Sequence, residues 1–178
     1  TAIDQGLEVL PVLNKIDLPA AEPDKVAQEI EEVIGIDAQN AARVSAKTGA
    51  GVSELLEAIV ERIPPPSGNF DAPLRALIFD SHYDAYKGVV AHVRVFDGRM
   101  SGRKPLLLMQ TGATFEPLEF GAFSPAMRPL QSLECGEVGY VATGLKDVAD
   151  CRVGDTITLQ ENPATEALPG YRQAKPMV

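Results

Sequence analysis

The tetrad Asn14-Lys15-Ile16-Asp17 carries side chains that can read the edge of a nucleobase. A carboxylate such as Asp17 accepts two hydrogen bonds at once, and the Watson–Crick edge of guanine presents two neighbouring N–H donors. Adenine has an acceptor at N1 and no amino group at C2, so it would leave the carboxylate unpaired. We expect selectivity for guanine of about 1–3 kcal/mol per charged hydrogen bond lost. Asn14 can bridge the base and nearby backbone, while the aliphatic stem of Lys15 covers the ring.

A second segment, Ser45-Ala46-Lys47, complements the tetrad. The backbone N–H of Ala46 can donate to guanine O6, Ser45 can hold its loop or Asp17, and Lys47 can cover the opposite face of the base. Both segments follow short apolar runs that predict strands, and ligands of open α/β sheets bind at the carboxyl ends of strands. The sequence therefore predicts a guanine site made of Asn14, Lys15, Asp17, Ser45, Ala46 and Lys47.

The phosphate-binding half of such a site is absent from the sequence. No G-x-x-x-x-G-K-[ST] segment occurs in the 178 residues, so no phosphate loop, P-loop lysine or Mg²⁺-binding hydroxyl of that type can be assigned. The chain begins at Thr1 without a methionine. We expect an internal piece of a GTPase with no catalytic residue of its own, which is inactive alone and binds GTP or GDP poorly.

The first third of the chain has the pattern of the end of an α/β domain. An apolar run over 7–13 predicts a strand buried on both faces, and residues 42–44 predict a second strand. Apolar residues recur at helical spacing over 23–34 and 52–63, which predicts two amphipathic helices. The strands that would cover this piece in a whole GTPase domain would then be missing, so a sheet edge and one helix face should be exposed.

The rest of the chain has the two-residue period of β-strands. Residues 64–69 are rich in proline and small polar residues, as interdomain linkers are. Beyond the linker we predict an antiparallel barrel, closed or partly closed. The predicted domains are 1–66 (GTP-binding domain, C-terminal part), 67–160 (barrel) and 161–178 (tail). The predicted strands are 74–79, 88–96, 106–109, 115–120, 138–143 and 156–159.

Composition narrows the functional classes. The net charge of -9 argues against indiscriminate binding to nucleic acid. Residues 1–63 hold 5 basic and 12 acidic side chains, and residues 64–178 hold 11 and 13, so RNA contact is better expected of the second part. Two cysteines, Cys135 and Cys151, and two histidines do not have the spacing of a metal site. No segment is long and apolar enough to cross a bilayer.

Several segments resemble translational GTPases of the LepA family, also called elongation factor 4. The order of strand, tetrad, helix, strand, Ser-Ala-Lys segment, helix and barrel is similar to the end of their GTPase domain and their domain II. Two departures are Gly102-Arg103-Lys104-Pro105, where the family has a Lys-Gly-Asp turn, and His82, where an aromatic residue is expected. Beyond the guanine segments, the resemblance rests on Ile63-Pro64-Pro65-Pro66, Ala76-Leu77-Ile78-Phe79-Asp80-Ser81, Gly136-Glu137-Val138-Gly139-Tyr140 and Val153-Gly154-Asp155-Thr156.

The resemblance implies a parent protein that hydrolyses GTP on the ribosome, with GTP or GDP and Mg²⁺ bound in the intact parent and none expected on this chain. It implies a cytoplasmic protein and allows a peripheral place at the cytoplasmic face of the membrane. Contact with small-subunit ribosomal RNA would involve Arg94, Arg99, Arg103 and Lys104, for which a solvated barrel face is the alternative. Two other interpretations stay open: a piece of a sister translational GTPase, and a stand-alone binding module without nucleotide chemistry.

Overall fold

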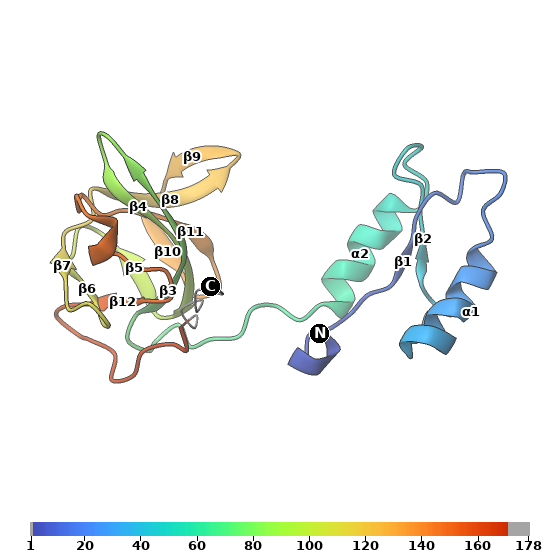
Figure 1. Ribbon diagram of the computed structural model, residues 1–178, viewed down its shortest axis with the longest axis horizontal. Helices are drawn as coiled ribbons and strands as arrows, with labels where there is room; N and C mark the ends of the chain where they lie inside the picture. The colour runs from blue at the N-terminus through green and yellow to red at the C-terminus, as the bar shows by residue number, and fades with distance from the viewer. Residues whose placement is uncertain (1, 171–178) are drawn as a thin grey trace, which may run out of the picture. The chain divides into compact units, whose positions relative to one another are not determined.

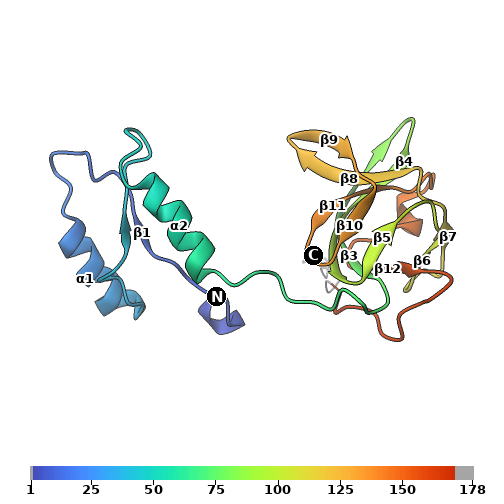
Figure 2. The same cartoon turned by 180° about the vertical axis from the view of Figure 1, so that it is seen from behind.

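The computed structural model describes residues 2–170, and the chain divides into two compact units between Pro65 and Pro66 (Figure 1). Unit 1 has a short 3-10 helix and two α-helices around a two-stranded parallel sheet, β1 with β2. Figures 1 and 2 show the α-helices on opposite faces of this sheet. The elements are η1 (Ile3–Gln5), β1 (Val12–Leu13), α1 (Pro23–Ile34), β2 (Ala42–Arg43) and α2 (Val52–Arg62).

Helix α1 begins and ends where the sequence predicts. Pro23 occupies the first helical turn, where its missing N–H costs nothing. Gly35 follows in the left-handed conformation, and its N–H donates to the carbonyls of Ile30 and Glu31. Helix α2 likewise confirms the second predicted helix, ending one residue early.

The core of unit 1 is small, and the predicted strand over 7–13 is wrong in length and burial. Only Val12 and Leu13 pair with a neighbour, and of residues 7–13 only Leu13 is buried. The other edge of β1 has no partner strand among the described residues, so the run before it is not held in a ladder. Leu13 packs with Ala27, Ala38 and Ala41, and no residue of α2 is buried. The expected exposed sheet edge and helix face are therefore present.

Unit 2 is an antiparallel sheet of eight strands in the order β7-β6-β12-β3-β4-β11-β8-β9, beside a two-stranded pair of β5 and β10. The pairings describe an open order from β7 to β9, so translation-factor-like β architecture is confirmed, whereas closure into a barrel is not shown. The strands are β3 (Arg75–Asp84), β4 (Gly88–Asp97), β5 (Arg99–Ser101), β6 (Leu106–Leu108), β7 (Thr114–Phe115), β8 (Glu119–Ser124), β9 (Ala126–Pro129), β10 (Ser132–Glu134), β11 (Val138–Ala142) and β12 (Thr156–Leu159).

Strand β4 shows how the sequence pattern builds the core. Val89, Ala91, Val93 and Val95 face the main cluster of buried residues, as alternation predicts. On the other face, His92 and Arg94 are half-buried, whereas Val90 is buried in a small second cluster with Tyr140 and Ala142. The predicted strand over 115–120 is wrong. Residues 116–118, which include Pro117, separate β7 from β8, because proline cannot donate to a ladder. Sequence reasoning also missed β5, β9 and β10, which are only three or four residues long.

Both segments that flank the sheet of unit 2 pack on it. The Asn69 N–H donates to Asp97 Oδ1 at 2.9 Å, and the Gly98 N–H donates to the Asn69 carbonyl at 2.8 Å. Asp97 also accepts from Arg75 Nε at 2.8 Å, and these N–H donors hold the pKa of the Asp97 carboxyl below its usual value. On the other side, the Leu168 N–H donates to Thr156 Oγ1 at 2.9 Å. The rest of the predicted tail, 171–178, lies outside the described residues.

Candidate functional site

The two predicted guanine segments lie at the same edge of the unit 1 sheet. Asn14 directly follows β1 and Ser45 lies just beyond β2, and these strands are parallel neighbours. The Asn14 side chain joins the two loops: its Oδ1 accepts from the Lys15 N–H at 2.7 Å and from the Ala46 N–H at 3.0 Å. One amide oxygen therefore fixes both segments against each other.

The tetrad loop turns sharply at Lys15. Its φ of 67° makes it the one non-glycine residue with a positive φ among residues 2–170, a conformation that costs about 1–3 kcal/mol and clusters at functional sites. The Ile16 N–H donates to the Val44 carbonyl at 3.3 Å, and the Leu18 N–H donates to the Lys15 carbonyl at 3.1 Å. These bonds hold the loop in that strained form.

The second loop is closed by Ser45. This residue is buried, and its Oγ accepts from the Thr48 N–H at 3.2 Å, so its hydroxyl holds its own loop. The Ser45 N–H donates to the Ala50 carbonyl at 2.9 Å, and the Gly49 N–H donates to the Ser45 carbonyl at 2.8 Å. Each main-chain group of Ser45 is thereby used within the loop.

Gly51 is a site residue that sequence reasoning missed. It has a φ of 71°, and an added Cβ would lie 2.2 Å from the Arg43 carbonyl oxygen. Only glycine fits there, because both the backbone angle and the lack of space exclude a side chain. The pair Gly49 and Gly51, just after the Ser-Ala-Lys segment, was the available indication in the sequence.

The side chains predicted to touch a base point into open surroundings. Asp17, Lys15 and Lys47 are exposed, and none of their side chains forms a hydrogen bond or ion pair with another residue of 2–170. By contrast, the Ala46 N–H, predicted to donate to guanine O6, already donates to Asn14. A base at this position would have to share that donor or take it over.

Two hollows flank helix α1, and neither lies between the two loops. One, of about 450 Å³, lies beside the tetrad and has a largely apolar lining that includes Leu13, Leu18, Val26 and Ile30. It borders Asn14 but none of residues 45–47. This hollow is the space next to the unpaired edge of β1.

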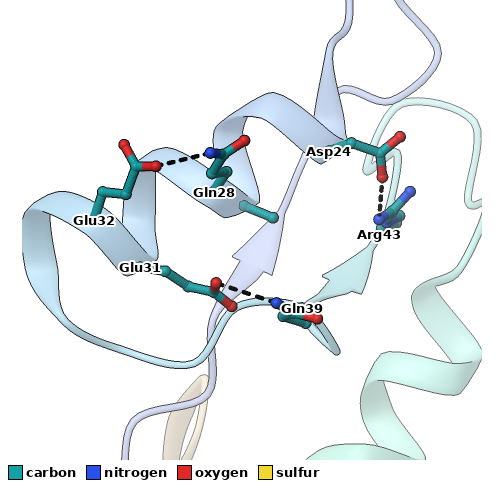
Figure 3. Close-up of a pocket in the computed structure, with 7 residues that line it drawn as sticks. Asp24, Gln28, Glu31, Glu32, Gln39 and Arg43 are labelled. Atoms are coloured by element: carbon teal, nitrogen blue, oxygen red, sulfur yellow. Dashed lines mark hydrogen bonds and ion pairs between the residues drawn. The ribbon is translucent and has the colours of Figure 1, made fainter.

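The other hollow, of about 480 Å³, lies between α1 and the segment 39–43 and is acidic (Figure 3). Its carboxylates are occupied by partners within unit 1: Arg43 Nη2 lies 2.6 Å from Asp24 Oδ1, and the Ala38 N–H donates to Glu31 Oε1 at 3.1 Å. Gln28 donates to Glu32 at 2.7 Å. The Arg43 contact ties β2 to α1, and the Ala38 contact ties the turn before β2 to the same helix. The negative charge of the carboxylates in this hollow disfavours phosphate.

The four predicted RNA-contact residues lie at separate places in unit 2. Arg94 is on the outward face of β4 with its guanidinium 4.5 Å from the centre of the Phe96 ring, and Arg99 on β5 lies 5.7 Å from the Phe70 ring. Arg103 is exposed in the turn after β5. Lys104 forms an ion pair with Glu161. They do not form one continuous basic stripe along a strand.

No helix in the described part of the chain could span a membrane. Among residues 2–170, no group of three or more His, Cys, Asp or Glu side chains is placed to hold a metal ion.

Each of the two units matches a known protein family. Residues 1–65 match the family described as Elongation factor Tu GTP binding domain, and residues 88–158 match Elongation factor Tu domain 2. Over 177 residues, 99% of this chain, it is 56% identical to elongation factor 4 of Bacillus licheniformis and 58% identical to that of Thermobifida fusca. The chain is thus similar to elongation factor 4 over nearly its whole length. The resemblance read from its sequence is thereby confirmed.

The chain spans 29% of the length of each of these elongation factor 4 relatives. Among solved structures, it is similar to translation elongation factor SelB from Methanococcus maripaludis in its apo form, with a TM-score of 0.71 and 16% identity, covering 90% of this chain and 35% of that one. A bacterial selenocysteine-specific elongation factor, EF-Sec, gives a TM-score of 0.66 at 18% identity, covering 89% of this chain and 28% of that one. At such identities, these likenesses show the fold alone.

Proposed function

We propose that this chain supplies the guanine-reading loops and domain 2 of an elongation factor 4 protein that binds and hydrolyses GTP on the ribosome. The observation that carries the proposal is the position of Asn14, whose Oδ1 holds the Lys15 and Ala46 amides together. Loops fixed in this way keep Asp17 and Lys47 available for a ligand without reorganisation when it binds.

In the proposed complex, Asp17 accepts from guanine N1–H and the exocyclic amino group, and the Ala46 N–H is shared between Asn14 Oδ1 and O6. The stems of Lys15 and Lys47 lie over the two faces of the base. The triphosphate and Mg²⁺ would be held by other parts of the intact protein, because no phosphate loop occurs in these 178 residues. Unit 2 would contact ribosomal RNA of the small subunit, with Arg94, Arg99 and Arg103 as phosphate contacts. The protein would act in the cytoplasm, where translation takes place.

The decisive variant is Asn14→Ala in the intact protein. It removes the acceptor of two backbone hydrogen bonds, each contributing about 0.5–1.5 kcal/mol, so GDP affinity should fall roughly 5- to 150-fold in calorimetry. Asn14→Asp keeps the acceptor and should lose less. If Asn14→Ala binds GDP as tightly as the wild type, the hydrogen bonds of Asn14 Oδ1 do not support nucleotide binding. Gln28→Ala changes an exposed residue of α1 that lines the acidic hollow and borders neither loop, so this control should bind GDP normally.

A further inference from the structure

A cluster of four rings lies on the face of the unit 2 sheet opposite the main core. It consists of Phe79 and His82 on β3, His92 on β4 and Phe123 on β8, and we call it the ring cluster. The centre of the His92 ring lies 6.1 Å from that of Phe79, 5.2 Å from that of His82 and 4.9 Å from that of Phe123. His92 is therefore the hub of a continuous aromatic surface.

This surface is exposed to a degree that core packing does not require. Ala91 and Val93, the neighbours of His92 along β4, are buried in the main core on the other side of the sheet, whereas Val90, on the same side as His92, is buried with Tyr140 and Ala142. Phe79 is 37% exposed and Phe123 is 41% exposed, whereas the His92 side chain is 22% exposed. A contiguous exposed aromatic patch on one sheet face marks an interaction site more often than chance exposure does.

Contacts with Tyr140 and between the two histidines fix the positions of the rings. Phe123 lies 5.3 Å from the ring of Tyr140, which is fully buried, and the Tyr140 hydroxyl donates to Glu119 Oε1 at 2.8 Å. Burial and the neighbouring Glu119 carboxylate raise the pKa of Tyr140 to about 12, so this donor keeps its proton. His82 Nδ1 and His92 Nε2 lie 3.1 Å apart, within hydrogen-bond distance. The cluster is thus ordered before any ligand arrives.

The polar groups around the rings fit a nucleobase with its phosphate. Arg94 follows His92 by two residues on the same strand face, and its guanidinium can neutralise a phosphate. The Asp80 carboxylate, 3.8 Å from His92 Nδ1, can accept from the edge of a base. Exposed aliphatic side chains that would favour a protein partner, Leu118 and Leu130, line a different hollow, of about 430 Å³.

We propose that the ring cluster stacks an unpaired base of RNA. The proposal rests on the ribosomal role proposed above. It adds a contact in which a base stacks on the rings, whereas the arginines proposed above contact phosphates through their charge. Aromatic faces accept any base, because every base has a π-face, and RNA recognition by proteins commonly uses such splayed-out bases. His82 fits this use, since an imidazole replaces the aromatic side chain expected there and still presents a ring face.

The test is fluorescence anisotropy of this chain with a labelled single-stranded adenosine hexamer. Phe79→Ala and Phe123→Ala should each weaken binding by about 5- to 100-fold, which is the effect of losing one base stack. Phe79→Tyr and Phe123→Tyr keep a ring and should bind as the wild type does. Val60→Ala is the control, because Val60 is 78% exposed but lies in unit 1, and it should also bind normally.

Three outcomes would overturn the proposal: no binding of the hexamer by the wild type, an equal loss in Val60→Ala, or unchanged binding in both alanine variants of the cluster. Binding of purified ribosomal proteins that is lost in those same variants, with no binding of RNA, would assign the surface to a protein instead. The same variants distinguish a failure of this proposal from a failure of the proposed guanine site. Asp17→Asn should leave hexamer binding unchanged, and Phe123→Ala in the intact protein should leave GDP affinity unchanged.

Discussion

Unit 1 and unit 2 differ in how completely they bury their own apolar surface. Unit 2 surrounds fully buried residues such as Ile78, Val93 and Leu108 with strands of its own sheet. Unit 1 has a core built mainly of Leu13 and three alanines, while Val60 on α2 remains 78% exposed. The difference teaches that a functional loop can be well formed on a scaffold whose packing is incomplete, because local backbone hydrogen bonds hold the loop.

The largest expected effect comes from the core of unit 2. Ile78→Ala should lower its free energy of unfolding by about 2–5 kcal/mol, because the cavity left behind adds to the lost burial. Val60→Ala in unit 1 should change the stability by less than about 0.5 kcal/mol. Urea unfolding can follow the units separately: all four tyrosines lie beyond Pro66, and both described α-helices lie in unit 1. Similar losses of unfolding free energy in the two variants would contradict the difference in core packing between the units.

A second test asks whether the bare face of α2 is covered in the intact protein. In this chain, Val60→Lys should alter stability by less than about 0.5 kcal/mol, since the side chain already faces water. In the intact protein, where we expect other parts of the GTPase domain to cover this face, the same change should cost about 1–3 kcal/mol. The measurement is the shift in the urea midpoint of each protein. Equal shifts would mean that the face stays exposed in both.

The smallest effect is a pH dependence confined to unit 2, which contains both histidines. Burial lowers the pKa of His92 below its ordinary value of 6.5; the neighbouring His82 acts in the same direction and Asp80 opposes it. Between the folded pKa and 6.5, the folded unit binds fewer protons than the unfolded chain. Stability should therefore be full above pH 6.5 and decline as pH falls through that window.

His92→Phe keeps a ring and removes the titration, so the tyrosine-detected unfolding of this variant should lose that pH dependence between pH 7 and 5. The helix signal of unit 1 should show no histidine-linked change in either protein. A pH dependence that survives in His92→Phe would assign it to another group.

The sequence predicted the elements whose physical causes are local. Pro23 and Gly35 mark the ends of α1, and the alternation along β4 identifies the side chains that face the main core. It also placed Asn14 and Ser45 at adjacent strand ends, because the order of elements is that of an α/β sheet. The tetrad predicted guanine binding directly, since the carboxylate of Asp17 matches the two N–H donors on the edge of guanine.

What the sequence could not show depends on contacts distant along the chain. The strand over 7–13 is cut to two residues because pairing, not hydrophobicity, defines a strand. The bridge from Asn14 to Ala46 joins residues 32 apart, and the ring cluster gathers His82, His92 and Phe123 from three strands. No local pattern distinguishes these side chains from ordinary surface residues.

The central claim is that Asp17 reads guanine, and the most direct measurement is nucleotide selectivity of the intact protein with Asp17→Asn. An amide pairs one donor with one acceptor, and xanthine presents the complementary edge where guanine presents two donors. The account predicts that the ratio of GDP to xanthosine diphosphate affinity, measured by calorimetry, falls by a factor of ten or more relative to the wild type, roughly one charged hydrogen bond. An unchanged ratio in a normally folded variant would contradict it.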